Sequence, residues 1–148
     1  MKSIQKKILT VEERIKRLKH LAQTLNSFEA YVSSARDKDV AERNIQVAVE
    51  SCLDIGKILI AIHHLKEPSD NKGVFMVLAE SGIIETTLLK FLIPMAGTRN
   101  ILVHGYDRID DALIYGIIQK HLPDFEQFIT QVRSHKSLEG EGPSTTPP

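Results

Sequence analysis

Four polar side chains that can take part in chemistry lie within eight consecutive residues: Arg99, Asn100, His104 and Tyr106. An apolar tripeptide lies between Asn100 and His104 and can anchor the segment in a core. An arginine guanidinium offers fixed donors that match phosphate oxygens. Histidine is the side chain best suited to transfer a proton near neutral pH. This combination predicts chemistry at a phosphate group.

The rest of the chain predicts a helical scaffold for this segment, because apolar residues recur every three or four positions along most of it. We expect a first long helix to start at Thr10, which forms a capping box with the Glu three positions later, and to reach Tyr31. A second helix is expected from Asp39 to about His64. Gly56 within it would let a neighbouring helix approach closely.

The second half of the chain predicts shorter helices separated by turns. Residues 66–73 have the composition of a loop, and a short apolar helix follows that ends at Gly82. The next helix is expected to begin near Thr86, and Pro94 within it removes a backbone hydrogen bond and favours a kink. A final helix, bent at Pro123, completes an all-α bundle of four to five helices.

Length and composition fit one domain. The 148 residues are 42% hydrophobic and 26% charged, with 19 Lys plus Arg against 19 Asp plus Glu. This neutral balance gives no global argument for nucleic-acid binding, so a phosphate site must be local or built by assembling chains. We expect a helical domain over residues 1–136 and a disordered, low-complexity tail over residues 137–148.

Cysteine usage and hydropathy predict the compartment. Cys52 is the single cysteine and cannot form an internal disulfide, which fits a core residue in a reducing environment. The first residues lack the apolar region of a signal peptide, and no apolar run reaches the roughly 18 residues of a membrane span. The sequence therefore predicts a cytoplasmic, soluble protein.

Three further features allow both a functional and a structural interpretation. Seven Lys or Arg against two Glu in the first twenty residues could face phosphate, but we favour a solvated helix face. Asp54, between two apolar residues, is either a buried carboxylate that needs a partner or an exposed one. His63 and His64 would point about 100° apart on a helix and lack acidic or cysteine neighbours, so no metal is expected. The remaining histidines lack such a context and are expected to be structural or exposed: His20, His121 and His135.

The pattern Arg-Asn-x-x-x-His resembles the signature of the HEPN superfamily of small helical proteins, and the longer segment over residues 99–106 resembles the HepT toxin group. The similarity extends to residues 42–56 and 75–84, and it covers roughly residues 11–134. Thr98 departs from the pattern, because relatives often carry an aromatic residue at that position.

The resemblance implies the toxin of a type VII toxin–antitoxin system, a metal-independent endoribonuclease with tRNA as the expected target and a 2′,3′-cyclic phosphate as product. His104 would act as general acid or base and Arg99 would hold the phosphate. Asn100 would position these groups, and Asp54 and Gly105 would support them. No cofactor is expected, because RNA carries its own nucleophile, the 2′-hydroxyl group.

The resemblance also implies two protein partners. HepT-like proteins are dimers, and Arg99 and His104, five positions apart, would differ in direction by about 140° on a straight helix, so a second copy is expected to complete the site. An MntA-type nucleotidyltransferase antitoxin would use ATP to transfer AMP units onto Tyr106 and block the phosphate site by charge and bulk. Two alternatives remain. One is a catalytically inactive HEPN domain that binds RNA or nucleotide or scaffolds the nucleotidyltransferase. The other is a helical dimerisation protein whose Arg99 forms an ion pair with Asp54 or Asp107.

Overall fold

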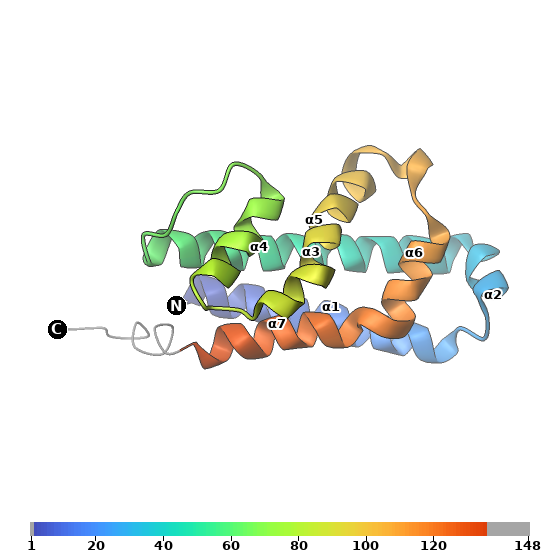
Figure 1. Cartoon of the computed structure of the whole chain (residues 1–148). Helices are drawn as coiled ribbons and strands as arrows, with labels where there is room; N and C mark the ends of the chain where they lie inside the picture. Colours follow the sequence, from blue (N-terminus) through green and yellow to red (C-terminus); the bar gives the residue numbers. More distant parts are fainter. Residues whose placement is uncertain (1, 136–148) are drawn as a thin grey trace.

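Figure 1 shows the computed structural model of the chain, which describes residues 2–135. All secondary structure within this range is helical, which confirms the predicted all-α fold. The tail expected at residues 137–148 lies outside the described residues. The helical elements are, in chain order, α1 (Lys2–Thr24), α2 (Phe28–Val32), α3 (Ala35–Ile62), α4 (Asn71–Glu80), η1 (Thr86–Leu88), α5 (Leu89–His104), η2 (Tyr106–Arg108), α6 (Asp111–Gly116), η3 (Ile117–His121) and α7 (Leu122–Ser134).

The bundle is built on three long helices that run side by side, α1, α3 and α7, with α4 and α5 crossing over α3 (Figure 1). Helix α2 packs against α3 and α6. If α6, η3 and α7 are counted as one continuous helix, the described residues form six helices. This is one more than the predicted four to five, and the additional helix is the short α2.

Helix α1 begins eight residues earlier than predicted, at Lys2 instead of Thr10. The reason is burial, because Ile4 and Ile8 are 0% and 2% exposed and extend the same apolar stripe as Val11. Thr10 is therefore inside the helix, and its hydroxyl group donates to the carbonyl oxygen of Lys6 at 3.1 Å instead of capping an end. Tertiary packing overrode the capping signal.

Two serines, which the prediction overlooked, divide α1, α2 and α3. Ser27 accepts a hydrogen bond of 3.0 Å from the backbone N–H of Ala30 and caps α2, so the first helix ends before Tyr31. Ser34 accepts a hydrogen bond of 3.1 Å from the N–H of Asp37 and starts α3. The start expected at Asp39 was wrong, because a serine cap precedes it by one turn.

Close packing between α3 and α4 depends on a glycine. A Cβ atom added at Gly56 would lie 2.5 Å from Val74 Cγ1 and 3.2 Å from Leu78 Cδ1. Any larger residue would push α4 away from α3. The close approach predicted at Gly56 is confirmed, and it sets the position of α4 against α3.

The two prolines expected within helices, Pro94 and Pro123, both lie in helices. Pro94 is inside α5, and Pro123 is in the first turn of α7. A π-helical segment, η3, comes directly before α7. Pro123 has no backbone N–H to donate, and the wider π-helical turn accommodates the hydrogen bond that is missing from the regular helix. The predicted bend in the last helix thus takes the form of a π-helical segment.

The core contains the single cysteine. Cys52 is 1% exposed, and burial raises the pKa of its thiol far above the ordinary value. The expectation that Cys52 is a core residue is confirmed. Among residues 2–135, no helix is both long and apolar enough to cross a membrane.

Candidate active site

The segment singled out by the sequence spans the last two turns of α5 and the start of η2. Arg99 and Asn100 lie inside α5, and His104 is its last residue. Gly105 follows as the C-cap, and its N–H donates to the carbonyl oxygen of Ile101 at 2.8 Å. The helix end therefore presents polar groups of the segment directly beside a turn.

Two hydrogen bonds fix the Arg99 guanidinium. Its Nε donates to Glu50 Oε2 of α3 at 3.1 Å, and its Nη1 donates to Asn100 Oδ1 at 3.2 Å. The side chains of Arg99 and Glu50 are 27% and 33% exposed, so the pair is half-buried. Arg99 thus pairs with Glu50 and not with Asp54 or Asp107, the two partners considered from the sequence.

Glu50 is the site residue that sequence reasoning missed. It is followed by three buried residues on α3, Ser51 to Leu53, where a carboxylate is uncommon. That placement was a usable signal, because an acidic residue on the inner part of a helix needs a cationic or hydrogen-bonding partner. The partner, Arg99, is 49 residues away in the sequence, and this separation hid the contact.

Arg99 borders a polar recess between α3, α5 and the start of α4. Asp54 lies in the same recess but is engaged elsewhere, because its Oδ2 is 2.9 Å from Lys7 Nζ. The Asp54 side chain is 44% exposed, so the carboxylate is partly exposed and also has a partner, which lies between the two alternatives. The recess is lined by Glu50, Leu53, Asp54, Lys57, Asn71 and Arg99.

His104 is exposed and does not meet Arg99 within the chain. Among the side chains that the structure describes, no hydrogen bond or ion pair joins these two residues. Both belong to the regular part of α5, where residues five apart point about 140° away from each other. Pro94 lies before both residues and so cannot bring them together. Their separation in direction therefore persists in the folded chain.

Gly105 lies against the side chain of Arg108. A Cβ atom added there would lie 2.9 Å from Arg108 Nη2 and 3.1 Å from Arg108 Nε. The Arg108 N–H also donates to the Gly105 carbonyl oxygen at 2.7 Å, which closes the turn of η2. The backbone of Tyr106 forms the first residue of this turn. Arg108 thereby adds a second guanidinium beside the turn that joins His104 to Tyr106.

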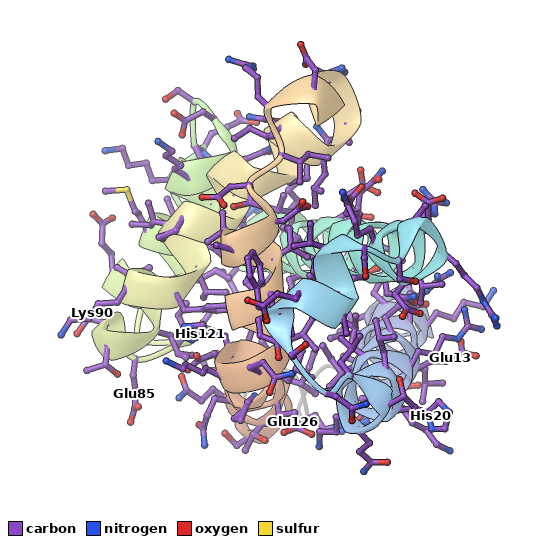
Figure 2. The ribbon with its side chains drawn as sticks, turned by 90° about the vertical axis from the view of Figure 1, so that its right-hand side faces the viewer. Glu13, His20, Glu85, Lys90, His121 and Glu126 are labelled. Atoms are coloured by element: carbon purple, nitrogen blue, oxygen red, sulfur yellow. The ribbon has the colours of Figure 1, made fainter. Side chains whose placement is uncertain are left out.

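The remaining histidines stay outside this site. His20 is exposed on α1 (Figure 2), and His121 Nδ1 lies 2.9 Å from Asp124 Oδ2. The His121 ring also stacks on Phe91, with ring centroids 5.6 Å apart. His135 makes an edge contact with the ring of His63. Within the described part of the chain, no group of three or more His, Cys, Asp or Glu side chains could hold a metal ion.

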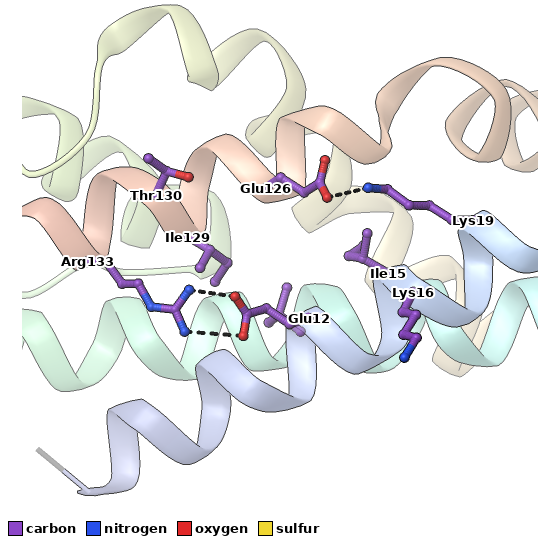
Figure 3. A pocket seen from close by; sticks show the side chains of 9 residues that line it. Glu12, Ile15, Lys16, Lys19, Glu126, Ile129, Thr130 and Arg133 are labelled. Atoms are coloured by element: carbon purple, nitrogen blue, oxygen red, sulfur yellow. Dashed lines mark hydrogen bonds and ion pairs between the residues drawn. The ribbon is translucent and has the colours of Figure 1, made fainter.

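Three basic residues of the first helix form ion pairs: Lys7, Arg17 and Lys19. Figure 3 shows a recess between α1 and α7 in which Arg133 binds Glu12, with Nη1 2.5 Å from Oε2, and Lys19 binds Glu126. Arg17 pairs with Glu13 along α1 itself. These contacts agree with a solvated helix face that also binds its neighbours, the interpretation favoured from the sequence.

Known proteins resemble this chain over almost its whole described length. The family model described as Ribonuclease HepT-like matches residues 11–132. The mRNA nuclease HepT of Shewanella oneidensis is 30% identical over 128 residues, which are 86% of this chain and 94% of that protein. The tRNA nuclease HepT of Aphanizomenon flos-aquae is 29% identical over 119 residues, 80% of this chain and 81% of that protein.

A solved structure extends the resemblance to three dimensions. The tri-AMPylated Shewanella oneidensis HEPN toxin, in complex with MNT antitoxin, matches with a TM-score of 0.81 and 29% identity. The match covers 90% of this chain and 98% of the toxin chain. Fold and sequence thus point to the same group of proteins.

Proposed function

This chain belongs to the ribonuclease HepT-like family, and on that basis we propose that it is the nuclease toxin of a toxin–antitoxin pair. We propose that its residues 99–106 form the site that cleaves RNA. One observation carries the proposal: Arg99, held by Glu50 and Asn100 at the end of α5, keeps donors free for a phosphate. The residue five positions later, His104, is exposed and able to exchange protons with a substrate.

The reaction uses the nucleophile that RNA carries. His104 accepts the proton of the 2′-hydroxyl group as its oxygen attacks the neighbouring phosphorus, and the bond from phosphorus to the 5′-oxygen breaks. The departing 5′-oxygen takes up a proton from the solvent, and the products are a 2′,3′-cyclic phosphate and a 5′-hydroxyl end. Arg99 stabilises the negative charge that develops on the phosphate oxygens. No step requires a metal ion or a cofactor.

Asn100 serves the site through Arg99. Its Oδ1 accepts from Arg99 Nη1 at 3.2 Å, which limits the rotation of the guanidinium. Asp54 does not contact Arg99 and acts less directly. It binds Lys7 and so holds this cation beside the recess that Arg99 borders. Gly105 leaves room for Arg108 next to the turn. These residues position charge and do not themselves exchange protons with RNA.

A second copy of the chain completes the site. Arg99 and His104 of one chain point about 140° apart, so one phosphate cannot contact both within a single α5. In a twofold dimer, Arg99 of one chain can meet His104 of its partner, and each copy contributes to both sites. A dimer also concentrates positive charge locally, although the whole chain has no net charge.

Tyr106 is the site of control by the antitoxin. An MntA-type nucleotidyltransferase would use ATP to add AMP units to the Tyr106 hydroxyl group, as the tri-AMPylated state of the Shewanella oneidensis toxin suggests. Each unit brings a phosphodiester charge to a position two residues from His104. The added groups would compete with RNA for Arg99 by charge and bulk. We place both activities in the cytoplasm, where tRNA and mRNA are available.

A cleavage assay tests the proposal. Total tRNA and a defined mRNA are incubated with the protein in EDTA, and product ends are identified by mass. Cleavage that leaves cyclic phosphate ends and falls about 10²-fold or more in His104→Ala and in Arg99→Ala supports the proposed function. RNA binding without cleavage would instead indicate a HEPN domain that recognises RNA or scaffolds the nucleotidyltransferase.

A further inference from the structure

The contact between α3 and α5 at Glu50 leads beyond the residues of the 99–106 segment. We propose that Glu50 is a positioning residue that orients Arg99 for phosphate binding and sets the side from which RNA approaches; this rests on the proposed ribonuclease function. The contact is direct, with Arg99 Nε 3.1 Å from Glu50 Oε2.

The hydrogen bonds leave a defined edge of the guanidinium free. Of the five N–H groups of an arginine side chain, Glu50 takes the one on Nε and Asn100 takes one on Nη1. One N–H on Nη1 and both on Nη2 remain. A phosphate oxygen can therefore bind the end of the guanidinium, and the side that faces α3 is already occupied.

Glu50 itself is held in place. Gln46, one turn earlier on α3, donates from Nε2 to Glu50 Oε2 at 3.4 Å. Buried residues anchor the same stretch of α3 in the core, among them Val49 and Cys52, each 1% exposed. The carboxylate thus projects from a fixed helix, and it transmits that fixed position to Arg99.

The second carboxylate of the recess does not compete for Arg99. Asp54 lies one turn after Glu50, but Lys7 engages its Oδ2 at 2.9 Å. Each acidic residue of the recess therefore has its own cation. This division leaves Glu50 alone to orient the guanidinium, and its negative charge repels a phosphate that would approach from the α3 side.

The geometry favours positioning over a purely stabilising role. Both side chains of the pair retain about a third of their exposure, and ion pairs with that much solvent contact contribute little to folding stability. The position of a phosphate-binding guanidinium, in contrast, affects the rate steeply. A misplacement of about 1 Å in an active site can cost about 10²-fold in rate.

The test measures kcat and KM for RNA cleavage in Glu50→Ala and Glu50→Gln. Glu50→Ala should lower kcat about 10- to 100-fold while KM changes little. Glu50→Gln keeps an acceptor oxygen for Arg99 Nε and should retain more activity than the alanine variant. Glu126→Gln is the matched control, because it removes a carboxylate from another pair between helices and should leave kcat unchanged.

A double-mutant comparison separates action through Arg99 from an independent effect. In an Arg99→Ala background, Glu50→Ala should cause no further loss, either in residual cleavage or in affinity for an RNA with a 2′-deoxy cleavage site. The Arg99 Nε–H resonance gives a second readout: slow exchange with solvent in the wild type should become fast in Glu50→Ala.

Two kinds of failure are distinguishable. A wild-type protein that cuts no RNA overturns the ribonuclease function itself. A wild-type protein that cuts RNA, together with a fully active Glu50→Ala variant, overturns only the role of Glu50. An equal loss in Glu126→Gln, or a loss of the same size in the Arg99→Ala background, also contradicts positioning through Arg99.

Discussion

The hydroxyl group of Thr98 donates a hydrogen bond of 3.0 Å to the carbonyl oxygen of Pro94, one turn earlier in α5. Thr98 is 6% exposed, so this side chain faces the core immediately before Arg99 turns toward α3. The residue that departs from the family pattern is thus bonded to the proline inside the same helix. Their contact belongs to the helix and not to the polar recess.

Replacing the threonine should therefore affect stability and not catalysis. Thr98→Val keeps the shape and removes one partly buried hydrogen bond, which should cost about 0.5–1.5 kcal/mol of unfolding free energy in urea titration. Thr130→Val, at an exposed position, is the control and should change stability less. A variant that folds as well as wild type but loses RNA cleavage would assign Thr98 to the site.

Mixing two inactive variants should restore RNA cleavage. Arg99→Ala and His104→Ala chains, unfolded in urea and refolded together, form mixed dimers in which one site receives an intact arginine and an intact histidine. With random pairing, the mixture should recover roughly a quarter of wild-type activity, since half of the dimers carry one working site of two.

The controls for mixing are each variant refolded alone and the wild type refolded in the same way. An inactive mixture beside an active refolded wild type would mean that both groups act within one chain. A monodisperse monomer that still cleaves RNA would contradict the composite site directly.

Replacing Tyr106 by phenylalanine should abolish the gain in mass that the antitoxin causes by transferring AMP. Wild-type protein incubated with an MntA-type nucleotidyltransferase and ATP should gain mass in units of AMP, and Tyr106→Phe should gain none, because no hydroxyl group is left to modify. The control is Tyr115→Phe, whose ring packs against Phe28 and Tyr31 and which should still be modified. Mass gain that persists in Tyr106→Phe would place the modification elsewhere.

Neutralising Glu42 should stabilise the fold at neutral pH. Burial, followed by the nearby carboxylates of Asp111 and Asp39, raises the pKa of Glu42, and Lys38 opposes this in part. The folded state therefore binds a proton more readily than the unfolded state, so stability falls as pH rises through the window above the ordinary glutamate pKa. Glu42→Gln removes this loss.

Thermal unfolding at two pH values measures the effect. The Tm of Glu42→Gln should exceed that of wild type at pH 7, and the two should converge at a pH below the ordinary pKa of glutamate, where both side chains are neutral. Glu29→Gln, at an exposed position of α2, should show no such gain. A gain that is larger at low pH than at pH 7 would have the wrong sign for this mechanism.

The bridge between α1 and α7 should contribute modestly and in a salt-dependent way. Arg133 contacts Glu12 with both terminal nitrogens (Figure 3), so Arg133→Ala should cost about 0.2–1 kcal/mol at low salt and less at high salt. Lys16→Ala, which lines the same recess, is the control. Equal losses for both variants at both salt concentrations would point to packing in place of charge.

The sequence was sufficient for the all-α class and for most of the later helix boundaries. Gly82, with φ of 82°, ends α4 as the composition predicted, and Asp110 caps α6. These signals are local, because a glycine with positive φ or an aspartate cap acts within one turn. The 99–106 segment was also visible, because its residue types are adjacent in the chain.

The failures share a different cause, which is that partners distant in sequence decide the outcome. Ile4 and Ile8 extend α1 because they are buried in the core. No capping residue in the sequence indicates this earlier start. Glu50 orients Arg99 from 49 positions away. A single sequence carries composition and spacing, but it does not state which face of α3 meets α5. That relation had to come from the structure.

The burial of Cys52 makes this chain convenient for site-specific fluorescence. Because the Cys52 thiol is buried and its pKa is raised, maleimide dyes should not react with the native protein. One cysteine introduced at an exposed position, such as Gln23 on α1, would then be the sole reactive thiol of each folded chain. Donor- and acceptor-labelled chains would report subunit exchange by energy transfer, in real time and without removal of the native cysteine.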